Sequence, residues 1–288
     1  MLALSSRRGL LYPRVGHRAK AKTRRRRLHR PLLGNPYLLK VQALRRTLSH
    51  WDSLFAASEE TRVPQLVRLN VVGEFLVNKY SWAIPDSRAI RILSAYAPLI
   101  EIGCGLGYWS RLLHDRGVDI IAADRLGPLP ASWTYIVKGG PLLLSKSYLQ
   151  GRNLFLCYPD ENSCLGSMCL KYFTGEYLIH VGELLVTGTQ CGYPQRPWGR
   201  TSSADFQVEL YEKFHCILSV ALHSYPVGRD FITVWKRTKF VGGIHQDEMN
   251  DDTWASIPFA EQMNEDRAAP CCRHLVGRRK NQYRYQKN

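Results

Sequence analysis

The sequence predicts an α/β fold: a mostly parallel sheet that carries helices on both faces and ends in an antiparallel hairpin. The first observation is a strand–turn–helix unit, in which an apolar run at 99–102 leads into alternating glycines and a helical pattern. The second is an apolar run at 118–124 that ends in an acid. The third is a pair of strand-like segments, 216–222 and 230–237, joined by a turn. Strands joined by a turn pair antiparallel, whereas strands joined through a helix pair parallel.

Three helical patterns precede the first strand. Apolar residues recur at helical spacing over 58–79, and a basic helix is expected over 36–49. Asp86 is a suitable N-cap for a third helix that runs through Ala95, because its carboxylate can accept hydrogen bonds from free backbone N–H groups. An aromatic loop, 80–85, separates the second of these helices from the third.

Further strands and one more helix are expected between the second strand and the hairpin. A short strand is expected at 134–137, whereas 142–149 fits neither a helix nor a strand clearly. A fifth strand is expected at 176–181, followed by a long loop rich in glycine and proline at 188–200. Hydroxyl residues at 201–203 then cap another helix before the hairpin.

The glycines after the first strand point to a ligand. Glycine permits a tight turn and lets backbone N–H groups approach a bound molecule, and here Gly103, Gly105 and Gly107 follow a strand that carries Glu101. About 20 residues later, Asp124 ends the second strand, where an acid can accept hydrogen bonds from both hydroxyls of a ribose. This spacing alone also suits a NAD-dependent oxidoreductase.

The E-x-G-x-G-x-G pattern from Glu101 to Gly107 resembles class I S-adenosylmethionine (SAM)-dependent methyltransferases, and the resemblance extends over about 64–238. It implies a Rossmann-like sheet of seven strands and SAM as the cofactor. Glu101 would bind the amino group of the methionine moiety of SAM, and Asp124 would bind its ribose. The residues implied at the cofactor are Glu101, Gly103, Cys104, Gly105, Gly107 and Asp124. The aromatic loop adds Tyr80 and Trp82, either as core residues or as walls of the cofactor pocket.

The same resemblance places catalytic and substrate-orienting groups at the end of the fourth strand, Asn153–Cys157. The Tyr-Pro-Asp sequence that follows is only loosely similar to the [DN]-P-P-[YF] loop of amino-group methyltransferases, because the order differs and one proline is missing. We expect Asp160 to orient or deprotonate the nucleophile, with Tyr158 and Glu183 beside the substrate. The alternative is that Asp160 opens a helix over 162–172, where the helix dipole favours an acid.

Charge is distributed unevenly along the chain, whose formal net charge is +16. Residues 1–50 and 271–288 hold many lysines and arginines and no acid, so the remaining middle is slightly acidic. We therefore expect a basic leader at 1–50, a methyltransferase-like domain with a helical extension at 51–238, and a flexible polar and basic tail at 239–288.

An arginine-rich, acid-free beginning is typical of transit peptides, which predicts a mitochondrial location. The alternative is a disordered arm that binds nucleic acid, or a nuclear signal at Arg24–Arg27, with a nuclear or cytoplasmic location. The basic ends make RNA or a ribonucleoprotein a possible partner.

Membrane spans and metal sites are not expected. No apolar run approaches the ~18 residues that a membrane-spanning helix requires. The chain has eight cysteines but no C-x-x-C pair, and the adjacent Cys271 and Cys272 have poor spacing for zinc. A disulfide framework is not expected in a chain of this length and pattern.

The sequence thus predicts a SAM-dependent methyltransferase of unknown substrate. The alternative is a catalytically silent protein of the same fold that binds RNA or assists assembly of the mitochondrial ribosome, and an oxidoreductase ranks third. A sulfonium methyl group is already activated, so such an enzyme mainly aligns the nucleophile with it. For this reason the sequence indicates a cofactor but not a substrate, an acceptor atom or an oligomeric state.

Overall fold

The computed structural model divides into two compact units, Met1–Arg30 and Pro31–Asn288. It describes residues 32, 34–184, 201–226, 228–238, 240–241 and 244–245. All structural statements below concern these residues of the second unit. The arginine run of the predicted leader, the loop at 188–200 and the tail from residue 246 lie outside them, so the predictions made for these segments stay predictions.

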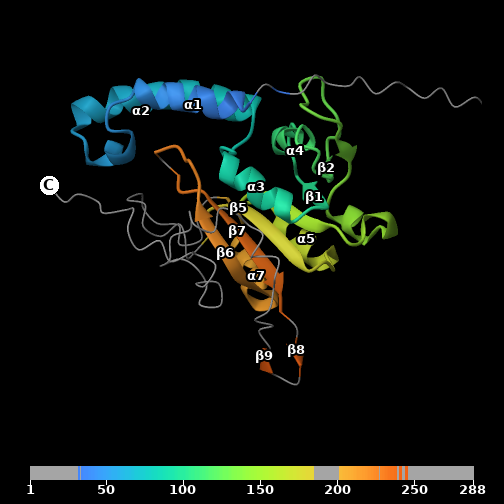
Figure 1. The fold of residues 1–288 in the computed structure, drawn as a ribbon. Coiled ribbons are helices and arrows are strands. Elements are labelled where there is room, and N and C mark those ends of the chain that lie inside the picture. Colours follow the sequence, from blue (N-terminus) through green and yellow to red (C-terminus); the bar gives the residue numbers. More distant parts are fainter. Residues whose placement is uncertain are drawn as a thin grey trace, which may run out of the picture. The chain divides into compact units, whose positions relative to one another are not determined.

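Seven strands form one sheet in the order β3-β2-β1-β4-β5-β7-β6 (Figure 1). The first five strands of this order are parallel neighbours, and β7 runs antiparallel to both β5 and β6. The strands are β1 Leu99–Ile102, β2 Ile120–Asp124, β3 Val137–Lys138, β4 Asn153–Cys157, β5 Tyr177–Gly182, β6 Phe214–Ala221 and β7 Phe231–Arg237. The predicted fold class, a mostly parallel sheet with an antiparallel C-terminal hairpin, is confirmed.

Helices cover both faces of the sheet. They are α1 Pro36–Arg46, α2 Glu59–Lys79, α3 Ser87–Ala95, α4 Tyr108–His114, α5 Leu165–Tyr172 and α7 Ala204–Lys213, with 3-10 turns η1 Trp51–Ala56, η2 Pro141–Ser145 and η3 Ser147–Leu149. The helices α1, α2, α3 and α4 pack on the sheet in one hydrophobic cluster. The helices α5 and α7 pack on it in a second cluster. In Figure 1, α1 and α2 lie at the top of the view.

Local signals set several of these elements. The carboxylate of Asp86 accepts a hydrogen bond from the backbone N–H of Ala89 at 2.9 Å, which confirms the predicted N-cap of α3. β4 occupies the residues expected for it. The segment 142–149, which the sequence left open, forms two 3-10 turns.

Other boundaries differ from the expected ones. The third strand begins at Val137, because the residues before it belong to the loop that packs over α4. The helix expected from residue 162 begins only at Leu165. A short antiparallel pair, β8 Phe240–Val241 with β9 Ile244–His245, lies in the segment predicted as a flexible tail.

The helix α1 lies inside the range predicted as a leader, yet it packs with the body of the fold. Tyr37 is fully buried, and Val41 and Leu44 are also buried one and two turns further along the helix. The side-chain oxygen of Asn35 caps α1 by accepting from the N–H of Leu38 at 3.1 Å. It also accepts from the hydroxyl of Tyr108 at 2.8 Å, so α1 is tied to the first residue of α4.

Among the described residues, no helix is long and apolar enough to cross a membrane. The same residues contain no group of three or more His, Cys, Asp or Glu side chains that could hold a metal ion. The described cysteines are free thiols, namely Cys104, Cys157, Cys164, Cys169 and Cys216.

Candidate functional site

The glycine turn follows β1 and has three residues in the left-handed region. The φ angles of Gly103, Gly105 and Gly107 are +76°, +55° and +74°. A Cβ on Gly103 would lie 2.7 Å from Leu165, and one on Gly107 would lie 2.9 Å from Thr134. Nothing lies within 4 Å of the position that a Cβ on Gly105 would take. Packing therefore requires the outer two glycines, whereas Gly105 leaves backbone accessible to a ligand.

Asp124 lies beside this turn because β1 and β2 are parallel neighbours in register. Its carboxylate accepts hydrogen bonds from the N–H of Gly105 at 3.1 Å and of Leu126 at 3.0 Å. An ionised carboxylate has about four lone-pair sites. Two backbone donors therefore leave capacity for further donors, such as the hydroxyls of a sugar.

Glu101 lies on β1 and is only 2% exposed. It accepts a hydrogen bond from the hydroxyl of Ser110 on α4 at 2.5 Å. Burial raises the pKa of its carboxyl to about 8, against a smaller opposing effect of that hydrogen bond. Burial also raises the pKa of the Cys104 thiol, which makes this cysteine a poor nucleophile.

Tyr80 belongs to an aromatic cluster beside the glycine turn. Its ring is stacked on Tyr37 with centroids 5.0 Å apart and on Trp133 with centroids 5.2 Å apart. It meets the ring of Tyr108, which directly follows Gly107, edge-on at 4.9 Å. With only 4% of its surface exposed, Tyr80 is a core residue, the first of the two roles that the sequence left open for it.

Trp82 lies two residues further on, at a different place. It is 62% exposed and its ring is stacked on Tyr158, with centroids 6.3 Å apart and planes within 14°. The short segment from Tyr80 to Trp82 therefore connects the glycine turn to the end of β4. Of the two residues, only Trp82 reaches the cavity described next.

A cavity of about 1000 Å³ lies over the ends of β4 and β5 and under α2. The sequence-predicted residues Tyr158, Asp160 and Glu183 all line it, together with Trp82. The opposite wall comes from α2 and includes Leu66, Leu69, Asn70, Gly73, Glu74, Val77 and Asn78. The structure thus brings the predicted substrate-side residues into one site.

The loop after β4 has an unusual backbone. Tyr158 and Asp160 have φ angles of +53° and +70°, a conformation that non-glycine residues adopt mainly at turns and functional sites. The Asp160 carboxylate accepts from the N–H of Asn162 at 3.0 Å. This hydrogen bond closes a turn at Asp160. The helix α5 begins later, with Cys164 at its N-cap, so the alternative prediction that Asp160 opens this helix is wrong.

Asp230 is a site residue that the sequence analysis missed. It immediately precedes β7, is 3% exposed, and accepts a hydrogen bond from the hydroxyl of Tyr158 at 2.5 Å. Burial raises the pKa of its carboxyl to about 7, and the nearby Glu183 acts in the same direction. The signal available in the sequence was a lone acid directly before a strongly apolar strand.

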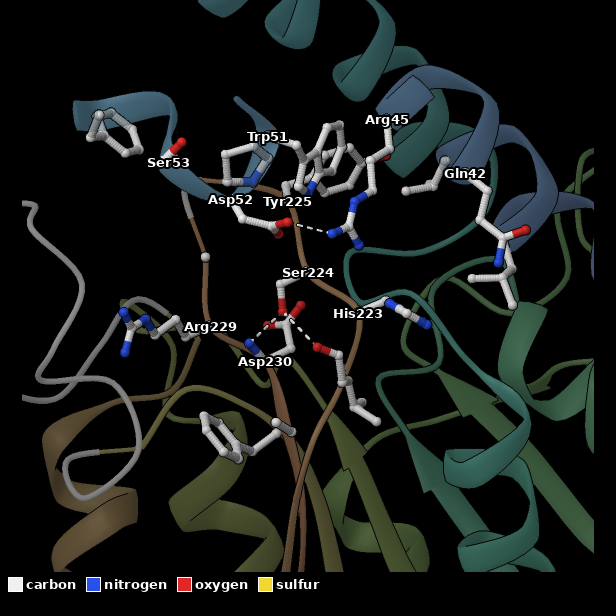
Figure 2. A pocket seen from close by; sticks show the side chains of 18 of the residues that line it. Gln42, Arg45, Trp51, Asp52, Ser53, His223, Ser224, Tyr225, Arg229 and Asp230 are labelled. Carbon is white, nitrogen blue, oxygen red and sulfur yellow. Dashed lines mark hydrogen bonds and ion pairs between the residues drawn. The ribbon is translucent and has the colours of Figure 1, made fainter. Parts of the chain in front are cut away.

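Asp230 also borders a second cavity of about 740 Å³, between α1, η1 and the connection from β6 to β7. Figure 2 shows this cavity, with Ser224 beside Asp230 and Arg45 paired with Asp52. The hydroxyl of Ser224 accepts from the N–H of Asp230 at 2.7 Å. Three residues of the connection, Tyr225, Gly228 and Asp230, line both cavities, so the connection forms the wall between them.

Comparison with known protein families and with curated proteins finds no match. Among solved structures, the 1,6-didemethyltoxoflavin-N1-methyltransferase of Burkholderia thailandensis, with bound 1,6-didemethyltoxoflavin and S-adenosylhomocysteine, is similar with a TM-score of 0.36. The identity is 13% over 64% of this chain and 92% of that chain. The N-methyltransferase NodS of Bradyrhizobium japonicum, in complex with S-adenosylhomocysteine, has a TM-score of 0.35 and 14% identity over 69% and 98% of the two chains. By its own strand order and antiparallel β7, the chain has the class I methyltransferase fold.

Proposed function

We propose that the protein is a SAM-dependent methyltransferase. The observation that carries the proposal is the accessible backbone of Gly105 beside the carboxylate of Asp124. Both lie at the carboxyl ends of adjacent parallel strands, where open α/β sheets bind their ligands. The order of the strands, with an antiparallel β7, favours this cofactor over a dinucleotide.

The residues present fit SAM. Asp124 would take the ribose hydroxyls with its remaining acceptor capacity, and the backbone at Gly105 would lie along the ligand. Glu101 would face the amino group of the methionine moiety, whose positive charge favours the ionised form of a buried carboxyl. When bound, SAM supplies an activated methyl group. The chain then has to bind the acceptor next to it, for which the cavity at Trp82 and Tyr158 is suitably placed.

Calorimetry on the full chain tests the proposal directly. Titrations with SAM, S-adenosylhomocysteine and NAD are compared under one set of conditions. We expect SAM and S-adenosylhomocysteine to bind and NAD to give no signal. Binding of NAD without binding of S-adenosylhomocysteine would overturn the proposal in favour of an oxidoreductase.

A further inference from the structure

The helix α2 carries an exposed apolar stripe on the face opposite to its buried residues. Four residues spaced four apart form this stripe, namely Val63, Val67, Val71 and Phe75. They are 46%, 60%, 65% and 61% exposed, in that order. Residues four apart lie on the same face of a helix, so the stripe is continuous and about 18 Å long. Single exposed apolar residues need no explanation, but a continuous apolar patch marks an interaction site.

The C-terminal end of the stripe carries a knob made of Phe75 and Lys79. The ammonium nitrogen of Lys79 lies 5.7 Å from the centre of the Phe75 ring, so the cation and the ring form one unit. Lys79 is exposed and, among the described residues, has no acidic side chain in an ion pair with it. The knob therefore presents an apolar ring and a positive charge together.

The N-terminal end of the same helix has the complementary features. An open hollow of about 600 Å³ lies there, lined by Ser58, Glu59, Glu60, Val63 and Pro64. Val63 and Pro64 make part of it apolar, and the two glutamates give it negative charge. Within the part of the chain that the structure describes, neither glutamate is in an ion pair. The hollow thus offers apolar contact for a ring and carboxylates for an ammonium group.

The knob and the hollow lie at opposite ends of one helix about 30 Å long, so a single copy cannot bring them together. Two copies related by a two-fold axis can, because each end of α2 then faces the opposite end of α2 in the other copy. With the axis at the middle of the helix, Val67 of one copy meets Val71 of the other, and Val63 meets Phe75. The same register sets each knob on the hollow of the other copy. One antiparallel arrangement therefore matches both the apolar stripe and the charges.

We propose that two copies of this chain associate through the exposed stripe of α2, packed antiparallel, with the knob of each copy in the hollow of the other. The inference is independent of the proposed cofactor. A contact one helix wide belongs with the small interfaces, which bury less than about 1,200 Å² in total and are transient. We therefore expect a dissociation constant in the micromolar range. The helix α2 also forms one wall of the cavity over the ends of β4 and β5, so the dimer would hold that wall in place.

Sedimentation velocity of the full chain, from about 1 to about 200 µM, tests the association. We expect the sedimentation coefficient to rise with concentration from that of a monomer to that of a dimer. Val67→Glu and Val71→Glu place a charge in the stripe at exposed positions where glutamate forms a helix at least as well as valine, so each should weaken the dimer ten-fold or more. Val208→Glu is the matched control, because Val208 is a 44% exposed valine on α7, and it should leave the dimer unchanged. A monomer at all concentrations, or a dimer that both stripe variants retain, would overturn the inference.

Charge reversal tests the antiparallel register. Glu59→Lys alone sets two positive charges against each other at both ends of the contact and should weaken the dimer about three-fold or more at low salt. Adding Lys79→Glu to the same chain restores an opposite-charge pair at both ends and should recover the association. A double variant that stays as weak as Glu59→Lys would show that these residues do not meet, which overturns the antiparallel pairing.

Two other occupants of the stripe are outcomes of the same measurements. If the full chain stays monomeric while a chain without residues 1–30 dimerises, the chain's own N-terminal segment covers the stripe. If the monomer floats with phosphatidylserine vesicles and the Val67→Glu variant does not, the occupant is a lipid surface. Either result would overturn the proposed dimer.

Discussion

The backbone N–H of Gly105 donates a hydrogen bond to the carboxylate of Asp124 at 3.1 Å, although the two residues are 19 positions apart. The bond links the carboxyl ends of β1 and β2. Asp124 therefore fixes the glycine turn on which the proposed cofactor would lie, and the same carboxylate would also bind the ribose. Tests of the site therefore need variants that separate loss of a contact from loss of the turn.

Gly105→Leu should block the cofactor without disturbing the core. The φ angle of Gly105 is +55° and its Cβ would enter open space, so the cost to folding is mainly the left-handed backbone, about 1–2 kcal/mol. The branched side chain would occupy the space that the ligand needs. We expect the affinity for S-adenosylhomocysteine, measured by calorimetry, to fall by about 100-fold, which corresponds to roughly 2.7 kcal/mol.

Gly117→Leu is the matched control for this variant. Gly117 has a φ angle of +77° and also has nothing within 4 Å of its Cβ position, but it lies beyond the far end of α4. It should lower the melting temperature to a similar extent and leave binding unchanged. Equal affinities of the Gly105→Leu protein and the wild type would refute the placement of the cofactor.

Asp124→Ala should weaken S-adenosylhomocysteine by ten- to a thousand-fold. Hydrogen bonds to a charged group contribute about 1.5–3 kcal/mol each, and the variant also releases the turn at Gly105. Asp119→Ala is the control. Asp119 lies directly before the first residue of β2, whereas Asp124 is the last residue of that strand, and Asp119 pairs with Arg152 at the surface. Calorimetry that gives both variants the affinity of the wild type would mean that the ribose is bound elsewhere.

Binding should release a proton from Glu101. At pH 7 this carboxyl is mostly protonated, since burial raises its pKa to about 8. The cationic amino group of S-adenosylhomocysteine favours the ionised form and lowers that pKa. Calorimetry in buffers with different ionisation enthalpies should therefore show release of a fraction of a proton. Glu101→Gln should abolish the release, and an equal release from the variant would assign the proton to another group.

Asp230 should make the protein less stable as the pH rises. Its pKa is raised from 3.8 to about 7 in the folded protein, so between these values the folded state keeps a proton that the unfolded state loses. The free energy of unfolding then falls with rising pH across this window, by at most about 1.4 kcal/mol per pH unit for one group. The titratable groups near this carboxyl are on Tyr37, Cys157, Tyr158 and Glu183.

Asp230→Asn isolates this contribution from that of Glu101, whose raised pKa acts in the same direction. Urea unfolding of the wild type and the variant is compared at several values between pH 4 and pH 7. We expect the variant to have the flatter dependence. Parallel curves for the two proteins would show that Asp230 titrates alike in the folded and unfolded states.

The meeting of the glycine turn with Asp124 was predictable because its signals are local. A strand, a glycine turn and an acid at the end of the next strand are read from one short stretch of chain, and the parallel register of β1 and β2 brings them together. The N-cap at Asp86 is local in the same sense. The packing of α1 was not predictable from its basic composition, because the burial of Tyr37 depends on Tyr80 and Tyr108 far along the chain.

The cavity over the ends of β4 and β5 depends on a strand order that the sequence does not reveal. The hairpin of β6 and β7 was expected, but not that β7, the later strand, would pair with β5. This pairing sets Phe231 opposite Gly182, and so places Asp230 next to Glu183 at the end of β5. An acid before an apolar strand therefore became part of the cavity through a long-range pairing alone.

Two truncations test where the functional body begins. Removing residues 1–30 leaves every described residue in the chain, and we expect the melting temperature and the affinity for S-adenosylhomocysteine to stay unchanged. Removing residues 1–50 also deletes α1, and with it the hydrogen bonds from Tyr108 to Asn35 and from Tyr37 to Tyr108. Because Tyr108 directly follows Gly107, we expect this second protein to melt at a lower temperature and to bind the ligand at least ten-fold more weakly. Weaker binding by the shorter truncation would make the first thirty residues part of the site, whereas full binding by the longer one would show that α1 is not needed to hold the glycine turn.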